Sequence, residues 1–204
     1  MMGKLTDRLF VNKFIYWVGE KIDNGRWEYV YQGYRRKYEI SPTFRFNGPH
    51  IHLIDDGRIV LGDDSYVGRG SHLQSSKGYE IRIGKKCAIS YYVMMYTMNR
   101  MTDQDFSKSV TPQCGNIRIG DYCWIGVHVY INQGVSIGDN VVIGANSVVT
   151  RNIPPHCVAA GSPARVVKFK SYLGSGETEK LAKQYWESLS PETRQLYSEV
   201  RPHR

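Results

Sequence analysis

The sequence predicts a mainly β fold, a parallel β-helix of six-residue repeats, because two registers of one repeat agree. At six-residue steps from residue 61, with two interruptions, an aliphatic residue or Met stands at Leu61, Val67, Leu73, Ile83, Ile89, Met95, Ile119, Ile125, Ile131, Ile137, Ile143 and Val149. Four residues after most of these stands a small residue, at Ser65, Ser71, Cys87, Val93, Cys123, Val129, Val135, Val141 and Ser147. A six-residue period suits a short strand and a tight corner, whereas an antiparallel sheet alternates with period two.

The first sixty residues precede this repeat. From Leu5 to Ile22 apolar residues recur at helical spacing, which predicts an amphipathic helix. Its polar side carries acids as well as lysines, which favours a helix packed on the domain or at a subunit contact over a membrane-surface anchor. Residues 26–60 contain turn residues and show no clean period, so we expect irregular strands and turns there. The β-helix is therefore predicted over residues 61–168.

Two excursions interrupt the repeat, Gln74–Arg82 and the longer polar stretch Thr97–Arg118. Loops that leave a rigid scaffold often carry function, so the loop of residues 97–118 is a candidate site element. Residues 169–204 are predicted as a helical tail, with one or two helices between Glu177 and Val200. Ser190 followed by Pro191 is typical of a helix start.

Composition describes a globular chain of 204 residues with 27 Lys and Arg against 19 Asp and Glu, a formal net charge of +8. The basic residues are spread out without an aromatic-rich nucleic-acid signature, so we expect a phosphorylated small molecule and no nucleic acid as partner. The four cysteines lack paired spacing, which predicts reduced structural thiols and no metal site. Without a signal peptide or an 18-residue apolar run, we expect a cytoplasmic protein, with a peripheral membrane contact of the N-terminal helix as the alternative.

One segment resembles a known family. Residues 117–168 read IRIGDYCWIGVHVYINQGVSIGDNVVIGANSVVTRNIPPHCVAAGSPARVVK. This stretch is similar to the hexapeptide-repeat acetyltransferases, notably the maltose, galactoside and polysaccharide O-acetyltransferases. The resemblance implies a left-handed β-helix, a homotrimer and acetyl coenzyme A as co-substrate in the groove between neighbouring coils. It also implies O-acetylation of a sugar in cell-surface polysaccharide or glycolipid synthesis.

The same resemblance places the coenzyme contacts. They fall on small residues of the later coils and on the closing turn with its cations, at Gly126, Gly144, Ala145, Ser147, Gly161, Pro163, Ala164, Arg165 and Lys168. A flexible thioester arm needs backbone donors along a smooth wall, and its phosphates need cations. For each glycine taken singly, turn geometry is an equally good explanation.

The proton-transfer side departs from the family. Acyl transfer to a hydroxyl needs a general base and a donor for the developing oxyanion. The family's catalytic histidine follows the pattern Ile-Tyr-Thr-x-x-His, whereas the stretch MYTMNRMTD puts Arg100 at that place. A second histidine of many related enzymes is replaced by Tyr91 and Tyr92, and a family Asn by Gly68. Arginine stays protonated, so it is no general base.

Three explanations remain open. Another residue serves as base, with His72 and the loop residues Asp103 and Asp105 as candidates beside Arg100. Alternatively the acceptor is an amine, as in nucleotide-sugar N-acetyltransferases, and Arg100 binds an acidic sugar or phosphate. In the third, the chain is an inactive coenzyme A binding or trimeric scaffold relative. We name His72, Arg100 and Asp103 as the candidate catalytic residues.

Overall fold

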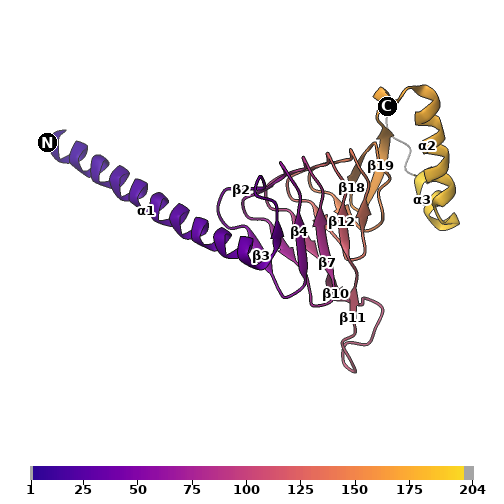
Figure 1. The fold of residues 1–204 in the computed structure, drawn as a ribbon, viewed down its shortest axis with the longest axis horizontal. Coiled ribbons are helices and arrows are strands. Elements are labelled where there is room, and N and C mark those ends of the chain that lie inside the picture. The colour runs from indigo at the N-terminus through magenta and orange to yellow at the C-terminus, as the bar shows by residue number, and fades with distance from the viewer. Residues whose placement is uncertain (1, 200–204) are drawn as a thin grey trace.

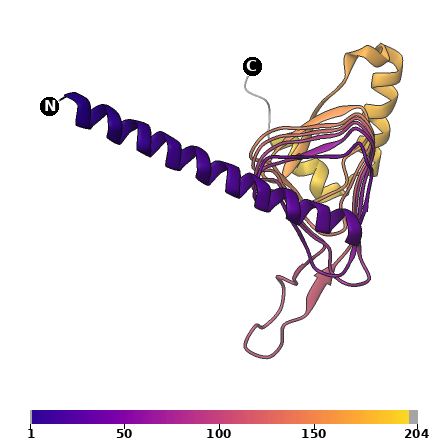
Figure 2. The same cartoon turned by 60° about the vertical axis from the view of Figure 1, so that its left-hand side comes forward.

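The computed structural model describes residues 2–199, with the side chains of residues 12–23 and 25–195. A long helix leaves one end of a column of stacked coils, a hairpin projects from the side, and two helices follow the last coil (Figure 1). The coils superimpose into one rounded triangle in the turned view (Figure 2). The chain therefore forms a solenoid with appendages at both ends.

The strands of the solenoid are β1 (Glu39–Ile40), β2 (Arg45–Asn47), β3 (His52–Ile54), β4 (Arg58–Leu61), β5 (Tyr66–Gly68), β6 (His72–Gln74), β7 (Glu80–Ile83), β8 (Ala88–Ile89), β9 (Met94–Tyr96), β12 (Ile117–Ile119), β13 (Trp124–Ile125), β14 (Tyr130–Ile131), β15 (Ser136–Ile137), β16 (Val142–Ile143), β17 (Val148–Val149), β18 (Cys157–Gly161) and β19 (Ala164–Phe169). The remaining elements are α1 (Met2–Lys37), β10 (Met98–Arg100), β11 (Pro112–Cys114), the 3₁₀ turn η1 (Ser171–Leu173), α2 (Ser175–Ser188) and α3 (Pro191–Glu199).

Each coil contributes one strand to each of three sheets. Sheet A has the order β1-β4-β7-β12-β15, sheet B the order β19-β18-β16-β13-β8-β5-β2, and sheet C the order β17-β14-β9-β6-β3. Neighbouring strands are parallel except β18 and β19, which are antiparallel. The described residues thus form five complete coils of a left-handed parallel β-helix, which confirms the predicted fold class.

The core of the β-helix is the predicted ladder. All twelve large residues of the first register are at most 3% exposed, and all nine small residues of the second register are buried as well. Parallel register stacks like on like, so that Ile89 lies between Val67 and Ile125. The small polar members tie coils together: the Ser65 hydroxyl donates to the Gly84 carbonyl at 2.7 Å and accepts the Cys87 amide at 2.8 Å.

Three of the four cysteines have a structural place, and Cys114 is half-buried in the hairpin. All four are free, and three of them are buried within the coils. Burial raises the pKa of the Cys157 thiol to about 12. A thiol that stays protonated at neutral pH is a poor nucleophile.

The β-helix begins earlier than predicted. Its first coil is β1–β3, so the repeat starts at Glu39 and the boundary at residue 61 was wrong. Its inward residues Ile40, Phe46 and Leu53 stack on the first predicted coil. The step from Ile40 to Phe46 is six residues, but the step from Phe46 to Leu53 is seven. In addition, the aromatic Phe46 stands where the repeat has an aliphatic residue. Both departures hid the first coil from a search for aliphatic residues at six-residue steps.

Helix α1 is also longer than predicted, running to Lys37 rather than ending near Ile22. Its last turns and the residue that follows them cap the first coil with aromatic side chains: Trp27, Tyr31 and Tyr38 are buried. The ring of Tyr31 stacks on Phe46 with centroids 4.3 Å apart. Aromatic packing at this end closes the core where no further coil covers it. None of the described helices is long and apolar enough to cross a membrane.

The loop and the C-terminal tail follow the prediction. The stretch from Thr97 forms the antiparallel hairpin β10–β11 before the chain re-enters the coils at β12. Helix α3 begins at Pro191, where the Ser190 hydroxyl accepts the Thr193 amide at 3.3 Å. Thr193 is buried and bonded to the Arg151 guanidinium, which fastens the tail to the end of the β-helix.

Candidate functional site

Three of the predicted coenzyme contacts, Gly126, Gly144 and Ala145, lie in one column. Ile125, Ile143 and Ala159 are paired along sheet B. The residues that follow each of them, Gly126, Gly144 and Ala160, therefore stack at the edge where sheet B turns into sheet C. We call this edge the B–C corner and define it by residues 68–70, 90–92, 126–128 and 144–146.

Close backbone approach explains the glycine at position 126. A Cβ there would lie 2.6 Å from the backbone nitrogen of Ala145 and 2.9 Å from its Cα. Backbone atoms of a stacked coil have no room to move away, so only Gly fits. The result is a smooth wall, with Ala145 exposed beside it.

Ser147 faces the interior rather than the wall. Its side chain has no exposed surface, and its hydroxyl donates to the Gly144 carbonyl at 2.7 Å. The same oxygen accepts the Gly161 amide at 3.0 Å. The hydroxyl therefore holds the closing turn against the last coil, and a ligand would meet at most the backbone of this residue.

The closing turn brings all but one of the remaining predicted contacts to the same edge. Strands β18 and β19 pair Gly161 with Ala164 across the turn that contains Pro163. Arg165 donates from its guanidinium to the Ala164 carbonyl at 3.0 Å. Lys168 is exposed but pairs with Val158, toward the other edge of sheet B. The cation at the end of the smooth wall is therefore Arg165, and phosphate groups need such a cation.

The tyrosines that replace the family histidine sit on two glycines. A Cβ on Gly68 would lie 2.4 Å from Cδ1 of Tyr91, and a Cβ on Gly70 would lie 2.4 Å from the ring of Tyr92. Both tyrosine side chains are nearly half exposed, at 42% and 43%. The Arg69 guanidinium stands over the Tyr91 ring at 5.6 Å. At Gly68 the backbone of Ser90 lies 2.8 Å from the same position, so both the Tyr91 ring and the next coil exclude a side chain there.

His128 links this aromatic pair to the wall. Its amide donates to the Tyr91 carbonyl at 3.1 Å, and its ring lies 5.2 Å from that of Tyr92. On the other side, the Asn146 amide donates to the Val127 carbonyl at 2.9 Å. The B–C corner thus runs without a break from the tyrosines to Ala145.

His72 lies on the outer side of sheet C. It is half-buried, its ring lies 4.6 Å from that of His52, and its strand neighbour on the next coil is Met94. Burial lowers the pKa of His72 below its usual range. A neutral imidazole can accept a proton, so its protonation state suits a general base.

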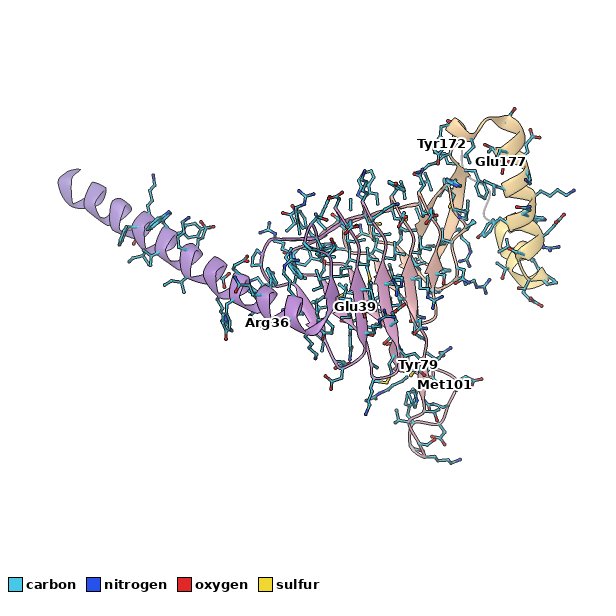
Figure 3. All side chains as sticks on the ribbon, in the orientation of Figure 1. Arg36, Glu39, Tyr79, Met101, Tyr172 and Glu177 are labelled. Carbon is cyan, nitrogen blue, oxygen red and sulfur yellow. The ribbon has the colours of Figure 1, made fainter. Side chains whose placement is uncertain are left out.

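The loop residues do not join His72. Arg100 is exposed opposite Pro112 in the hairpin, and within the described part of the chain its guanidinium has no carboxylate partner. Asp103 is exposed at a bend in the same loop. Figure 3 marks Met101 where this loop stands away from the coils. The structure therefore leaves the three predicted catalytic residues apart within one chain.

Asp105 has a structural explanation. Its carboxylate accepts bonds from the Ser107 amide at 3.0 Å and hydroxyl at 2.6 Å, and Lys108 lies 3.3 Å away. These partners hold the pKa of Asp105 below its usual range. A carboxylate stabilised in its ionised form is a weak base.

Asn99 was missed by the sequence analysis. Its amide group donates to the Tyr130 hydroxyl at 2.9 Å, to Asn132 at 2.9 Å and to Gln133 at 2.8 Å. These contacts fasten the start of the loop to sheet C, one residue before Arg100. The available signal was the polar run Tyr130, Asn132 and Gln133 at outward positions of one coil.

Comparison with known proteins gives one family match. The family described as bacterial transferase hexapeptide (six repeats) matches residues 116–151. These residues include the coils that carry Gly126 and Gly144.

Individual relatives match more of the chain. A galactoside O-acetyltransferase of Escherichia coli (strain K12) is 39% identical over 138 residues, which are 66% of this chain and 68% of the relative. A polysialic acid O-acetyltransferase of Escherichia coli O1:K1 / APEC is 36% identical over 54% of this chain, which corresponds to 36% of the relative. Among solved structures, a hexapeptide-repeat acetyltransferase of Vibrio cholerae O1 biovar eltor, complexed with acetyl coenzyme A, has a TM-score of 0.58 and 30% identity, covering 66% of this chain and 73% of its own.

Proposed function

The chain belongs to the hexapeptide-repeat acetyltransferase family, and we propose that it transfers an acetyl group from acetyl coenzyme A to a sugar hydroxyl in cell-surface polysaccharide or glycolipid synthesis. The observation that carries the proposal is the unbroken B–C corner. It has a smooth wall with Arg165 at one end and an exposed aromatic pair at the other. Those are the features that a thioester arm and a sugar ring need from a protein surface.

At the donor end, Gly126 and Ala145 leave room for the pantetheine arm, Arg165 lies beside the closing turn for the phosphates, and Lys168 follows three residues further along β19. A solved relative of 30% identity is complexed with acetyl coenzyme A, which supports the same co-substrate here. The arm would place its thioester toward His128 and the tyrosines. The phosphates and the thioester take these places because the B–C corner runs from the closing turn to the tyrosines.

At the acceptor end, Tyr91 and Tyr92 are both exposed, and the C–H face of a sugar stacks on the Tyr92 ring because the Arg69 guanidinium already stands over the Tyr91 ring. Arg69 suits hydroxyl or acidic groups of the same sugar. Two relatives are named for sugar acceptors, one a galactoside and the other polysialic acid. An acidic sugar matches the formal charge of +8 on this chain.

Direct transfer is the chemistry that this site supports. The acceptor oxygen forms a bond to the acetyl carbonyl carbon, the C–S bond breaks, and the hydroxyl proton passes through a base to the leaving thiolate. Two histidines are candidates for the base: His72, whose pKa is lowered by burial, and His128, which lies beside Tyr92 on the B–C corner. Comparing kcat of the His72→Gln and His128→Gln variants distinguishes the two candidates. Replacing the true base by Gln lowers kcat by about 100-fold or more.

We further propose that the active unit is a homotrimer in the cytoplasm. The indole of Trp124 stands 58% exposed on the outer side of sheet B, and interfaces are enriched in such aromatic residues. A neighbouring subunit would cover it and complete the groove beside the wall. Four free thiols support a reducing compartment.

The test combines donor binding and transfer in one sample. Calorimetric titration with acetyl coenzyme A measures donor binding, and thiol release on adding sugars, amino sugars or nucleotide sugars measures transfer. Saturable binding with release by a sugar hydroxyl is the expected result. Release only by amino sugars would assign N-acetylation instead, and failure to bind acetyl coenzyme A would overturn the donor assignment.

A further inference from the structure

Helix α1 carries an apolar face that the β-helix does not cover. In its outer half Phe14, Ile15, Trp17 and Ile22 are between 54% and 68% exposed. Together with the half-buried Val18 they form one side of the helix, which we call the outer face. Exposed apolar groups gathered in this way mark an interaction surface.

The outer face points away from the rest of the molecule. Successive residues of an α-helix are about 100° apart, so the outer face lies roughly opposite the side formed by Trp27, Tyr31 and Tyr38, with which α1 packs on the first coil. Asp23 confirms the direction of the packing side, because its carboxylate lies 3.8 Å from His50 of the first coil. The apolar side thus reverses along one continuous helix, and the chain's own β-helix cannot reach the outer face.

Charge is divided between the two sides of the outer half. Lys21 lies within the outer face, with its ammonium 5.9 Å from the Trp17 ring. Arg26 stands one turn after Ile22, whereas Lys13 lies seven residues before Glu20 and therefore on the side of that acid. The acids are on the other side, where Glu20 accepts the Tyr16 hydroxyl at 3.2 Å and Asp23 faces His50. Among the side chains described from residue 12 to residue 23, the outer face is therefore apolar with the cation Lys21, and both acids lie away from it.

This pattern favours a lipid surface over a second copy of the helix. In a symmetric parallel bundle of α1 helices, Lys21 would meet its own copies inside the contact, where like charges repel. On an anionic bilayer the same ammonium reaches the head groups while its stem and Trp17 lie among the acyl chains. Figure 1 shows α1 extending clear of the coils, and Figure 3 marks Arg36 near its junction with them.

We propose that the outer face of α1 binds an anionic membrane surface, so that the catalytic β-helix is held beside the bilayer. The helix lies on the membrane and does not span it. The inference is independent of the acceptor, since it rests on α1 alone. The two parts of this segment then contact different surfaces: residues 27–38 pack on the first coil, and residues 14–22 lie on the lipid.

Flotation of the full chain with vesicles tests the proposal. We expect binding to vesicles of phosphatidylcholine with phosphatidylglycerol, weaker binding to phosphatidylcholine alone, and release by salt. The double variant Ile15→Gln with Ile22→Gln should weaken binding by at least about tenfold, because two apolar side chains no longer enter the bilayer. Tyr16→Ser is the matched control: it removes a side chain that is 69% exposed on the opposite side and should leave binding within about twofold.

Circular dichroism and acetyl coenzyme A titration show that each variant is folded. Absence of binding by the unaltered chain, or equal binding by the double variant, would overturn the proposal. A loss of oligomer mass in light scattering of the double variant would overturn it as well, because the outer face would then be a subunit contact.

Discussion

The two ends of the B–C corner use glycine for different reasons. At the donor end, Gly126 is required by the backbone of the next coil, because an added methyl group would lie 2.6 Å from the backbone nitrogen of Ala145. At the acceptor end, Gly70 is required by a side chain, since only ring atoms of Tyr92 lie that close. The first constraint belongs to the solenoid itself. The second belongs to the particular site that this chain has built on it.

The comparison explains why one end matches the family and the other does not. A backbone contact repeats in every coil of the same geometry, so the donor wall is kept wherever the coils are kept. The acceptor end can change if a glycine and the ring above it change together. Gly70 with Tyr92 is such a pair, and Tyr92 is one of the two tyrosines that stand in place of a family histidine.

The largest expected effect is a loss of stability after a substitution at the donor end. Gly126→Ala should lower the free energy of unfolding by about 3 kcal/mol, because the added methyl group meets backbone atoms that cannot yield. Thermal denaturation followed by circular dichroism measures the loss. Gly33→Ala is the control: nothing lies within 4 Å of that methyl position, and an alanine inside α1 should stabilise the protein by up to about 1 kcal/mol. Equal stability of the Gly126→Ala variant would contradict the packing argument.

A double-mutant cycle sharpens the contrast at the acceptor end. Gly70→Ala should destabilise the protein less when Tyr92→Ala has already removed the ring, with a coupling free energy of about 1–2 kcal/mol. The backbone strain at Gly70, whose φ is +70°, is the same in both backgrounds and cancels. Chemical denaturation of the four proteins gives the coupling. Additive losses would mean that the ring moves aside without cost.

Regular packing could be predicted from the sequence, and its exceptions could not. The spacing of apolar residues predicts the ladder from Leu61 to Val149, and the structure confirms that every one of these residues is buried. The first coil was not predicted because the step from Phe46 to Leu53 is seven residues instead of six. The side of α1 that packs on the β-helix was not predicted because the apolar stripe changes sides between Ile22 and Trp27. Sequence spacing alone does not say which stripe contacts the β-helix.

The site divides in the same way. Most of the predicted coenzyme contacts come together because they follow equivalent strands. The exceptions are the Ser147 side chain, which turns inward, and Lys168, which pairs with Val158 away from the corner. The predicted catalytic residues stay apart because Arg100 and Asp103 belong to a loop whose path no repeat specifies. Asn99 and its three partners decide that path, and their meeting depends on a contact across more than thirty residues.

Function offers a second way to separate the two ends. Tyr92→Ala should raise the acceptor KM by about three- to tenfold, the value of one aromatic stacking contact, and leave acetyl coenzyme A affinity within about twofold. Lys168→Ala should do the reverse, weakening acetyl coenzyme A by about threefold through the loss of one exposed cation. Initial rates and calorimetry measure both. A change of both constants in either variant would mean that donor and acceptor subsites overlap.

The smallest expected effect is a pH dependence on the acceptor side. Burial lowers the pKa of both His52 and His72, and the charge of His72 lowers that of His52 further. The unfolded chain therefore takes up protons near pH 6.5 while the folded chain does so only at lower pH. Stability should be level above about pH 7 and fall as the pH drops through about 6.5, since protons then bind the unfolded state more strongly. Urea denaturation across this range should show a shallower fall for His72→Gln, and an unchanged slope would mean that His72 does not titrate in this way.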